Sequence, residues 1–369
     1  MTNTMFNNLN KIPVRTKSWL NVNDISLKNF QPPAITAFSN VRIYGEDIEG
    51  VTIKRLLKGE MFPVGKSFKY GVGDELIAQG ETEFNHGYLI DIRKNIKCKE
   101  PVIIEYELNE NNITLVDNFI VIAHENSNAT IIIKYMSKDN SIGYHNGVCK
   151  IYGSENSEIN VIKVNLLNDN TVHFDSNLSD VQYGAKVKYT TIDLGSGYSI
   201  NNYHGDLMGD SGESILSTIY MGDKNKVIDM NYVMTHRGRR TNSEINVKGA
   251  ILGEAKKIFK GTLDFKKGAT KSIGNEEEYC MLLSPKAQAK AVPLLLCEEE
   301  EVSGQHAASA GKIDEDKLFY LMSRGLNSNE AKKLIIEAAF NPIINIIPVE
   351  GIKNEILEEI QRRLINEVY

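Results

Sequence analysis

The chain has 369 residues, of which 41% are hydrophobic and 24% charged, and its formal net charge is −6. This length can bury a large core and form more than one structural region. The acidic balance argues against a nucleic-acid partner, because such proteins need a basic face to displace counterions.

No segment at the N-terminus has the apolar core of a signal peptide, and no stretch is apolar for long enough to cross a bilayer. We therefore expect a cytoplasmic protein with no membrane partner. The four cysteines (Cys98, Cys149, Cys280 and Cys297) lack the CxxC spacing of zinc and redox motifs, so free thiols are expected. Cys297 falls in a predicted strand, where a cysteine usually behaves as a small buried apolar side chain.

Residues 1–60 have a mixed character and are interrupted by Pro13, Pro32 and Pro33. Within them, the stretch 51–58 fits either a strand or a short helix. We expect a small N-terminal α/β region that packs on the main body.

Between about residue 85 and residue 295, short runs of β-branched and aromatic residues alternate with Asn, Asp, Gly and Ser, which is typical of strands and corners. Their spacing of about ten residues fits sandwiches, barrels and solenoids alike. The lack of helical periods and the many Asn- and Gly-marked corners favour a parallel β-helix, in which each coil covers the next. The predicted strands are Tyr88–Ile92, Val102–Tyr106, Phe119–Ala123, Thr130–Met136, Val148–Tyr152, Ile159–Val164, Val187–Leu194, Ser214–Met221, Val227–Met234 and Ile258–Phe265.

From about residue 312 the sequence is helical. Asp314 is a good N-cap for a first helix, and Gly325 suits the left-handed residue that ends it. Asn327 or Ser328 can begin a second helix with help from Glu330, and Asn341-Pro342 is expected to end it.

A last helix is predicted near 349–365, where Ile352, Ile356 and Ile360 recur every four residues. Two i,i+4 pairs, Glu358–Arg362 and Glu359–Arg363, are expected on its solvent side. The helices should either cap one end of the solenoid or form a lobe of their own.

The run Leu318-Phe319-Tyr320-Leu321-Met322-Ser323-Arg324-Gly325-Leu326, preceded by His306-Ala307-Ala308-Ser309 and followed by Glu330-Ala331, resembles the C-terminal signature of the SufB/SufD family of iron–sulfur cluster assembly proteins. Weaker similarities occur upstream in the family's order. They are Ile12-Pro13 with Trp19, His236, Ser243, the stretch from Phe259 to Phe265, Leu282-Leu283-Ser284 and Pro293.

This resemblance implies a right-handed parallel β-helix over residues 61–310, flanked by an N-terminal region over 1–60 and a helical domain over 311–369. It also implies a non-catalytic SufD-like scaffold subunit that pairs with a SufB-like chain and binds a SufC-like ATPase through its C-terminal helices. The partner-binding residues would be Leu318, Phe319, Tyr320, Arg324 and Gly325. No cofactor would be bound stably by the chain alone, although a transient iron–sulfur cluster could form in the complex.

One position places the chain closer to SufD than to SufB. When Pro293 is matched to the family's proline, Ala287 occupies the position of the SufB cysteine, which SufD proteins lack. The chain also departs from the family at Leu296, where a glutamate is often found, so one expected polar group is absent. By the same resemblance, His306 is a candidate ligand, or near-ligand, of iron or a nascent cluster at the partner interface. The alternative is a hydrogen-bonding histidine in a turn, and His145 is likewise expected in a turn.

Other functions remain open at this stage. The chain could be a SufB-like or homodimeric cluster scaffold, or a β-helix carbohydrate-active enzyme, which would need carboxylates clustered on an exposed sheet face. ATP hydrolysis is not expected, because the sequence contains no GxxxxGK[ST] phosphate-binding loop.

Overall fold

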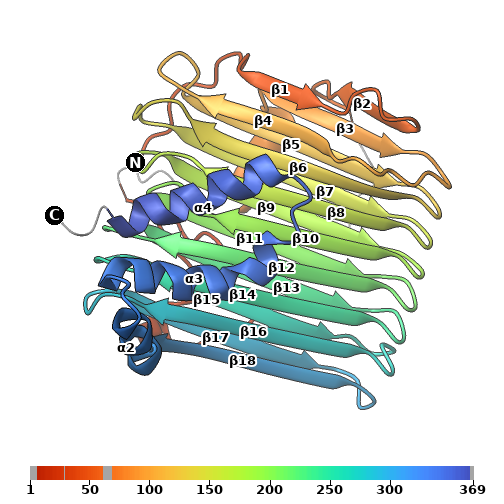
Figure 1. The fold of residues 1–369 in the computed structure, drawn as a ribbon. Helices are drawn as coiled ribbons and strands as arrows, with labels where there is room; N and C mark the ends of the chain where they lie inside the picture. Colours follow the sequence, from red (N-terminus) through yellow and green to blue (C-terminus); the bar gives the residue numbers. More distant parts are fainter. Residues whose placement is uncertain (1–5, 29, 61–68, 366–369) are drawn as a thin grey trace.

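The computed structural model describes residues 6–28, 30–60 and 69–365, and it forms a parallel β-solenoid followed by three helices (Figure 1). Each coil contributes one strand to each of two nine-stranded sheets, which we call the front sheet and the back sheet. Register pairs lie about 30 residues apart along the chain, so each coil stacks directly on the one before. The mainly β solenoid that the sequence predicts is therefore confirmed.

The front sheet contains, in spatial order, β1 (Val41–Tyr44), β4 (Val102–Leu108), β6 (Asn128–Ser137), β8 (Glu158–Leu166), β10 (Lys186–Asp193), β12 (Glu213–Gly222), β14 (Asn242–Ile251), β16 (Ile273–Leu282) and β18 (Ser303–Lys312). The back sheet contains β2 (Val51–Arg55), β3 (His86–Ile92), β5 (Thr114–Ala123), β7 (Tyr144–Gly153), β9 (Val172–Val181), β11 (Tyr198–Leu207), β13 (Val227–His236), β15 (Lys256–Phe265) and β17 (Gln288–Cys297). Pairing is parallel except at the N-terminal end, where β1 pairs antiparallel with β4 and β2 pairs antiparallel with β3. The stretch 51–58 thus begins as a strand, and the predicted boundary at residue 61 lies outside the described residues.

A residue with positive φ recurs at the corner that follows the back-sheet strands. The chain uses asparagine at three successive corners (Asn95, Asn126 and Asn156) and glycine at the next, Gly184. Asparagine and glycine tolerate this left-handed conformation better than other residues do. The backbone N–H of each of these corner residues donates to a carbonyl of the next coil, so the corners stack in register like the strands.

The outer face of the back sheet is covered by the N-terminal segment and α1 (Asp74–Thr82), where Phe6, Leu9 and Leu76 are buried against it. A short 3₁₀ helix, η2 (Ser18–Leu20), lies within the same N-terminal segment. Asn10 anchors the segment, because its Nδ2 donates to Asp229 Oδ1 at 2.7 Å and its carbonyl accepts from Lys260 Nζ at 2.8 Å.

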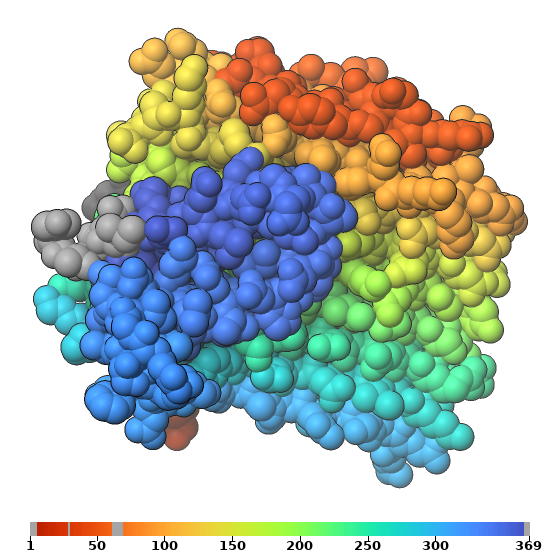
Figure 2. Space-filling view, viewed as in Figure 1, coloured from red at the N-terminus to blue at the C-terminus, as the bar shows by residue number. Residues whose placement is uncertain are grey.

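The outer face of the front sheet is covered by α3 (Ser328–Ile344) and α4 (Glu350–Ile365). Both helices lie across the middle strands, and Figure 2 shows them covering part of this face. Their apolar side chains, including Phe340, Ile356 and Ile360, pack against outward-facing residues of the sheet such as Ile162 and Ile219. The prediction that these helices cap an end or form a separate lobe is therefore wrong, because the front sheet offers a continuous apolar outer face.

Two local predictions for these helices are also wrong. Pro342 lies inside α3, which continues to Ile344, because Phe340, Ile343 and Ile344 are all buried against the solenoid and their packing outweighs the lost hydrogen bond. The pair Glu359–Arg363 does form, but Arg363 is fully buried instead of solvent-exposed.

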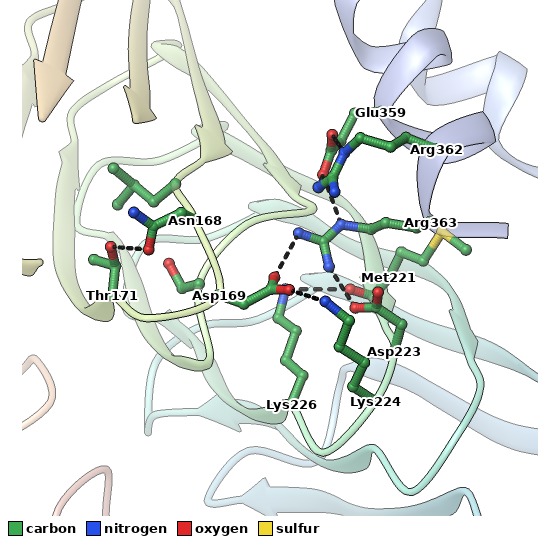
Figure 3. A network of polar contacts seen from close by, with 12 residues as sticks. Asn168, Asp169, Thr171, Met221, Asp223, Lys224, Lys226, Glu359, Arg362 and Arg363 are labelled. Atoms are coloured by element: carbon green, nitrogen blue, oxygen red, sulfur yellow. Dashed lines mark hydrogen bonds and ion pairs between the residues drawn. The ribbon is translucent and has the colours of Figure 1, made fainter. Parts of the chain in front are cut away.

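Arg363 holds α4 onto two corners of the solenoid (Figure 3). Its guanidinium forms ion pairs with Asp223, which follows β12, and with Asp169, in the β8–β9 corner, at 3.1 Å from the latter. Its Nε also donates to Glu359 Oε1 at 2.7 Å. Three carboxylates therefore surround one buried guanidinium, whose planar array of donors suits several partners at once.

Replacing Arg363 with methionine should destabilise the fold by about 3–5 kcal/mol, because Asp223 would remain buried without its cation. Urea denaturation followed by circular dichroism measures this change. Arg362→Met is the matched control, since Arg362 is half-exposed and pairs with Glu359 at the surface, and it should change stability by about 0.5 kcal/mol or less. Equal effects of the two substitutions would contradict the role of Arg363 in holding α4 on the solenoid.

Candidate functional site

The C-terminal end of the solenoid is open. Within the described residues, no strand pairs with the outer edge of β17 or β18, which end the two sheets. Neither strand contains a buried residue, whereas at least half of the residues in every strand from β5 to β16 are buried. An exposed pair of ten-residue edges with free N–H and C=O groups is a surface that another chain can extend.

The interior of the solenoid changes character as it reaches this end. One interior column of the front sheet runs through register partners Leu216, Ile245, Glu276 and His306, on β12, β14, β16 and β18. Register partners in neighbouring parallel strands point to the same side of the sheet. The apolar column therefore ends in a carboxylate, and His306 lies above that carboxylate on the open face.

Glu276 is buried, with 2% of its surface exposed, and neither carboxylate oxygen has a hydrogen-bond partner in the structure. Its carboxyl group lies against Gly261 of β15, where even a Cβ atom would come within 2.3 Å of it. Burial, and secondarily the neighbouring Glu278, raises the pKa of Glu276 to about 8. The site therefore contains a carboxyl group that lacks the partner its charged form needs.

Glu278, two residues along the same strand, is satisfied. It forms a buried ion pair with Lys257 and accepts a hydrogen bond from the Tyr220 hydroxyl at 2.9 Å. Burial raises the pKa of Glu278, while Lys257 opposes that shift. The contrast shows that the fold can supply partners to a buried carboxylate here, and that Glu276 has none.

His306 lies within β18 and is exposed, so the alternative that placed it in a turn is wrong. The sequence analysis did not identify Glu276, because Glu276, Glu277 and Glu278 read as one charged run. The signal was present as the alternation of β16, where Gly274, Glu276 and Glu278 are buried and the residues between them are exposed.

The cysteines do not converge on the open end. Cys149 and Cys280 are buried, and burial raises the pKa of both thiols, to about 12 for Cys149. Cys297 is exposed, and its thiol lies 3.0 Å from the carbonyl of Glu299. The expectation that Cys297 is buried is wrong, because the coil that would cover the last strand is missing.

Other histidines belong to the solenoid interior. His145 lies in β7, not in a turn, and its ring stacks on that of His173 with the two Nδ1 atoms 2.7 Å apart. Burial, together with His145, lowers the pKa of His173 to about 3. His236 is buried as expected, between the hydroxyls of Thr241 and Ser243.

The predicted partner-binding residues lie on or just after α2 (Glu315–Ser323), beside the open end (Figure 1). Asp314 caps this helix as predicted, and Gly325 follows it with a φ of 100°. No residue of α2 is buried, and Phe319 and Tyr320 are 74% and 56% exposed. The Arg324 guanidinium lies over the Tyr320 ring, 5.2 Å from its centre.

A groove of about 850 Å³ separates α2 from α3 and the outer face of β16. Its apolar lining includes Met281, Leu321, Leu334 and Ile335. Leu318 is partly exposed, whereas Arg324 and Gly325 are exposed. The structure therefore leaves a short aromatic helix and an apolar groove uncovered, which is the composition of a protein-docking surface.

The fold is a stacked parallel β-solenoid with an open end and a flanking helical hairpin. The chain belongs to the SufBD core family of SUF-system iron–sulfur cluster assembly proteins, whose family model matches residues 106–339. The family resemblance in the sequence is thus confirmed. No helix in the described part of the chain is long and apolar enough to span a membrane.

Three relatives illustrate the match. The chain is 27% identical over 282 residues to the iron–sulfur cluster assembly protein SufD of Bacillus subtilis (strain 168), and the aligned region covers 76% of the chain and 64% of that protein. It is 26% identical over 293 residues to the SufBD family protein PH1385 of Pyrococcus horikoshii, covering 77% and 64%. A SufBD family protein of Staphylococcus epidermidis is 22% identical over 278 residues, covering 75% and 60%. The chain thus spans less than two thirds of the length of each relative.

The pKa of Glu276 predicts how Glu276→Gln changes the pH dependence of stability. Because the folded pKa lies above the ordinary value of 4.5, the native state binds more protons than the unfolded state between about pH 4.5 and pH 8. The wild type should lose stability through this window, at up to about 1.4 kcal/mol per pH unit, relative to the Gln variant.

Unfolding free energies of both proteins at pH 5 and pH 8.5 test this. The difference between them should be small at pH 5 and a few kcal/mol in favour of Glu276→Gln at pH 8.5. Glu277→Gln is the control, since Glu277 is exposed and pairs with Lys248 at the surface. A difference that does not vary with pH would show that Glu276 is not held neutral.

Proposed function

We propose that this chain is a SufD-like, non-catalytic scaffold subunit that pairs with a SufB-like chain through the open end of the solenoid and binds a SufC-like ATPase through α2 and the adjoining groove. Family membership and similarity to SufD support an assembly role over a carbohydrate-active enzyme. The open end is the observation that carries the pairing, because two edge strands and the uncovered interior lie there together.

The open end fits another solenoid better than a small ligand. A strand of the partner could hydrogen-bond to β17 or β18, while interior side chains of the partner cover Leu295. Leu295 is 43% exposed although it is in register with the buried Leu263. His306 would then become buried at the contact between the two chains. A transient iron–sulfur cluster formed there would be cargo of the complex rather than a resident group of this chain.

The ATPase would engage the other exposed surface. Phe319 and Tyr320 are rigid aromatic side chains beside an apolar groove, and such residues commonly dominate binding energy. ATP-dependent movement of the ATPase could shift the scaffold only if the ATPase bound two arrangements of the scaffold with different affinity.

Leu295→Asp should prevent pairing with the SufB-like chain, because the new carboxylate would be buried without a partner; we expect an affinity loss of about a hundredfold. Co-purification and titration of the two scaffold chains measure this. Tyr198→Asp is the matched control, since Tyr198 is 42% exposed but lies at the start of β11, away from the open end. Full pairing by Leu295→Asp would contradict the proposed interface.

The same titration tests the alternatives. If the wild-type chain remains alone while the SufB-like chain and the ATPase associate, the SufD-like role is wrong. A stable dimer of the isolated chain that Leu295→Asp dissociates would favour the homodimeric scaffold instead.

Phe319→Ala should weaken ATPase binding by about thirtyfold while scaffold pairing is retained, since Phe319 is exposed on a helix with no buried residue. Binding of the purified ATPase to the scaffold pair provides the measurement. Ile142→Ala serves as the control, because Ile142 is 66% exposed in the β6–β7 corner. Unchanged ATPase affinity in Phe319→Ala would show that Phe319 of α2 does not contribute to ATPase binding.

A further inference from the structure

Glu276 and His306 occupy adjacent positions of one interior column only because the last two coils stack in register. The two residues are 30 positions apart in the sequence but are register partners in adjacent parallel strands. Neighbouring strands lie about 4.8 Å apart, and register partners share one face of the sheet. Glu276 is therefore the nearest carboxylate along the interior column that ends at His306.

Among the described residues, none forms a hydrogen bond with the buried Glu276 carboxyl group. A buried carboxylate normally receives hydrogen bonds or an ion pair, because its desolvation is otherwise costly. Lys257, which also lies in the interior, is committed to Glu278 and to the carbonyl of Lys290. No side chain in the described part of the chain is therefore available as a partner for the ionised form of Glu276.

Gly261 makes room for the carboxyl group from the opposite sheet. The side chains that precede it in its column, at Tyr203 and Tyr232, are large, and a side chain at residue 261 would displace the Glu276 carboxyl. The next residue in that column, Pro293, is incompletely buried at the open end. The carboxylate therefore lies in a cradle, one coil below the surface that the proposed partner would cover.

We propose that Glu276 and His306 form a two-ligand half-site for ferrous iron, which the partner chain completes when it covers the open end. This inference rests on the proposed function and extends it from a histidine to a defined ligand pair. An imidazole nitrogen with a carboxylate oxygen is a donor set that suits divalent iron. The cation would supply the positive partner that the ionised Glu276 carboxylate lacks.

The chain does not form a complete site by itself. Among the described residues, no group of three or more histidine, cysteine, aspartate or glutamate side chains is arranged to hold a metal. Two protein ligands leave coordination positions for water and for donors of the partner. Incomplete coordination suits a transient binding site from which iron is passed into a cluster.

The test is a titration of the purified full chain with Co²⁺, an air-stable substitute for Fe²⁺, followed by ligand-field absorption. Wild type and Glu277→Gln should bind one Co²⁺ with the same affinity, because Glu277 faces outward and pairs with Lys248. Glu276→Gln and His306→Ala should each bind at least about tenfold more weakly. Anaerobic titration with Fe²⁺ should reproduce this order.

The outcomes separate the half-site from the scaffold role. If wild type binds no Co²⁺, or if Glu276→Gln binds as tightly as wild type, the half-site is wrong, whatever the partners do. Glu276→Gln and His306→Ala should still pair with the SufB-like chain, since neither removes the edge strands. Failure of the wild-type chain to pair with the SufB-like chain would refute the proposed function independently of the half-site.

Discussion

The in-register stacking of parallel strands is the constraint on which the rest of this structure depends. Each interior side chain is covered by its register partner in the next coil, so burial continues for as long as coils are added. A solenoid of this kind must end, and its last coil then has no cover. In this chain the C-terminal end presents β17 and β18 without a single buried residue, and the exposure of His306, Leu295 and Cys297 follows from that one fact.

The two outer faces are closed by different chemistry. The N-terminal segment is held on the back sheet partly by polar contacts, in which Asn10 lies between Asp229 and Lys260. The C-terminal helices are held on the front sheet by apolar packing and by the buried Arg363. These contacts tie α3 and α4 to the middle coils of the solenoid.

Glu276 illustrates the cost of burying a carboxyl group without a partner. Its burial without a partner disfavours the ionised carboxylate and lowers the stability of the isolated chain as the pH rises. The neighbouring Glu278, which has Lys257 and Tyr220, shows that this cost is not imposed by the fold. Destabilising residues of this kind are commonly retained where a binding partner supplies the missing interaction.

The sequence by itself determined the mainly β solenoid, ten of its strands, the Asn- and Gly-marked corners, a cap at Asp314, a second cap at Asn327 or Ser328, and the family. These follow from local preferences and short motifs. It did not predict the short β1, nor β9, β11, β14, β16 and β18. The inward-facing positions of this second group include polar residues such as Asp175 and Glu276, and whether these residues have partners is decided across coils. The position of α3 and α4, the burial of Arg363, and the pairing of Glu276 with His306 were decided by tertiary structure alone. Each depends on which residues some 30 positions or more apart share a column, and register is a property of the stacked coils rather than of any single stretch of chain.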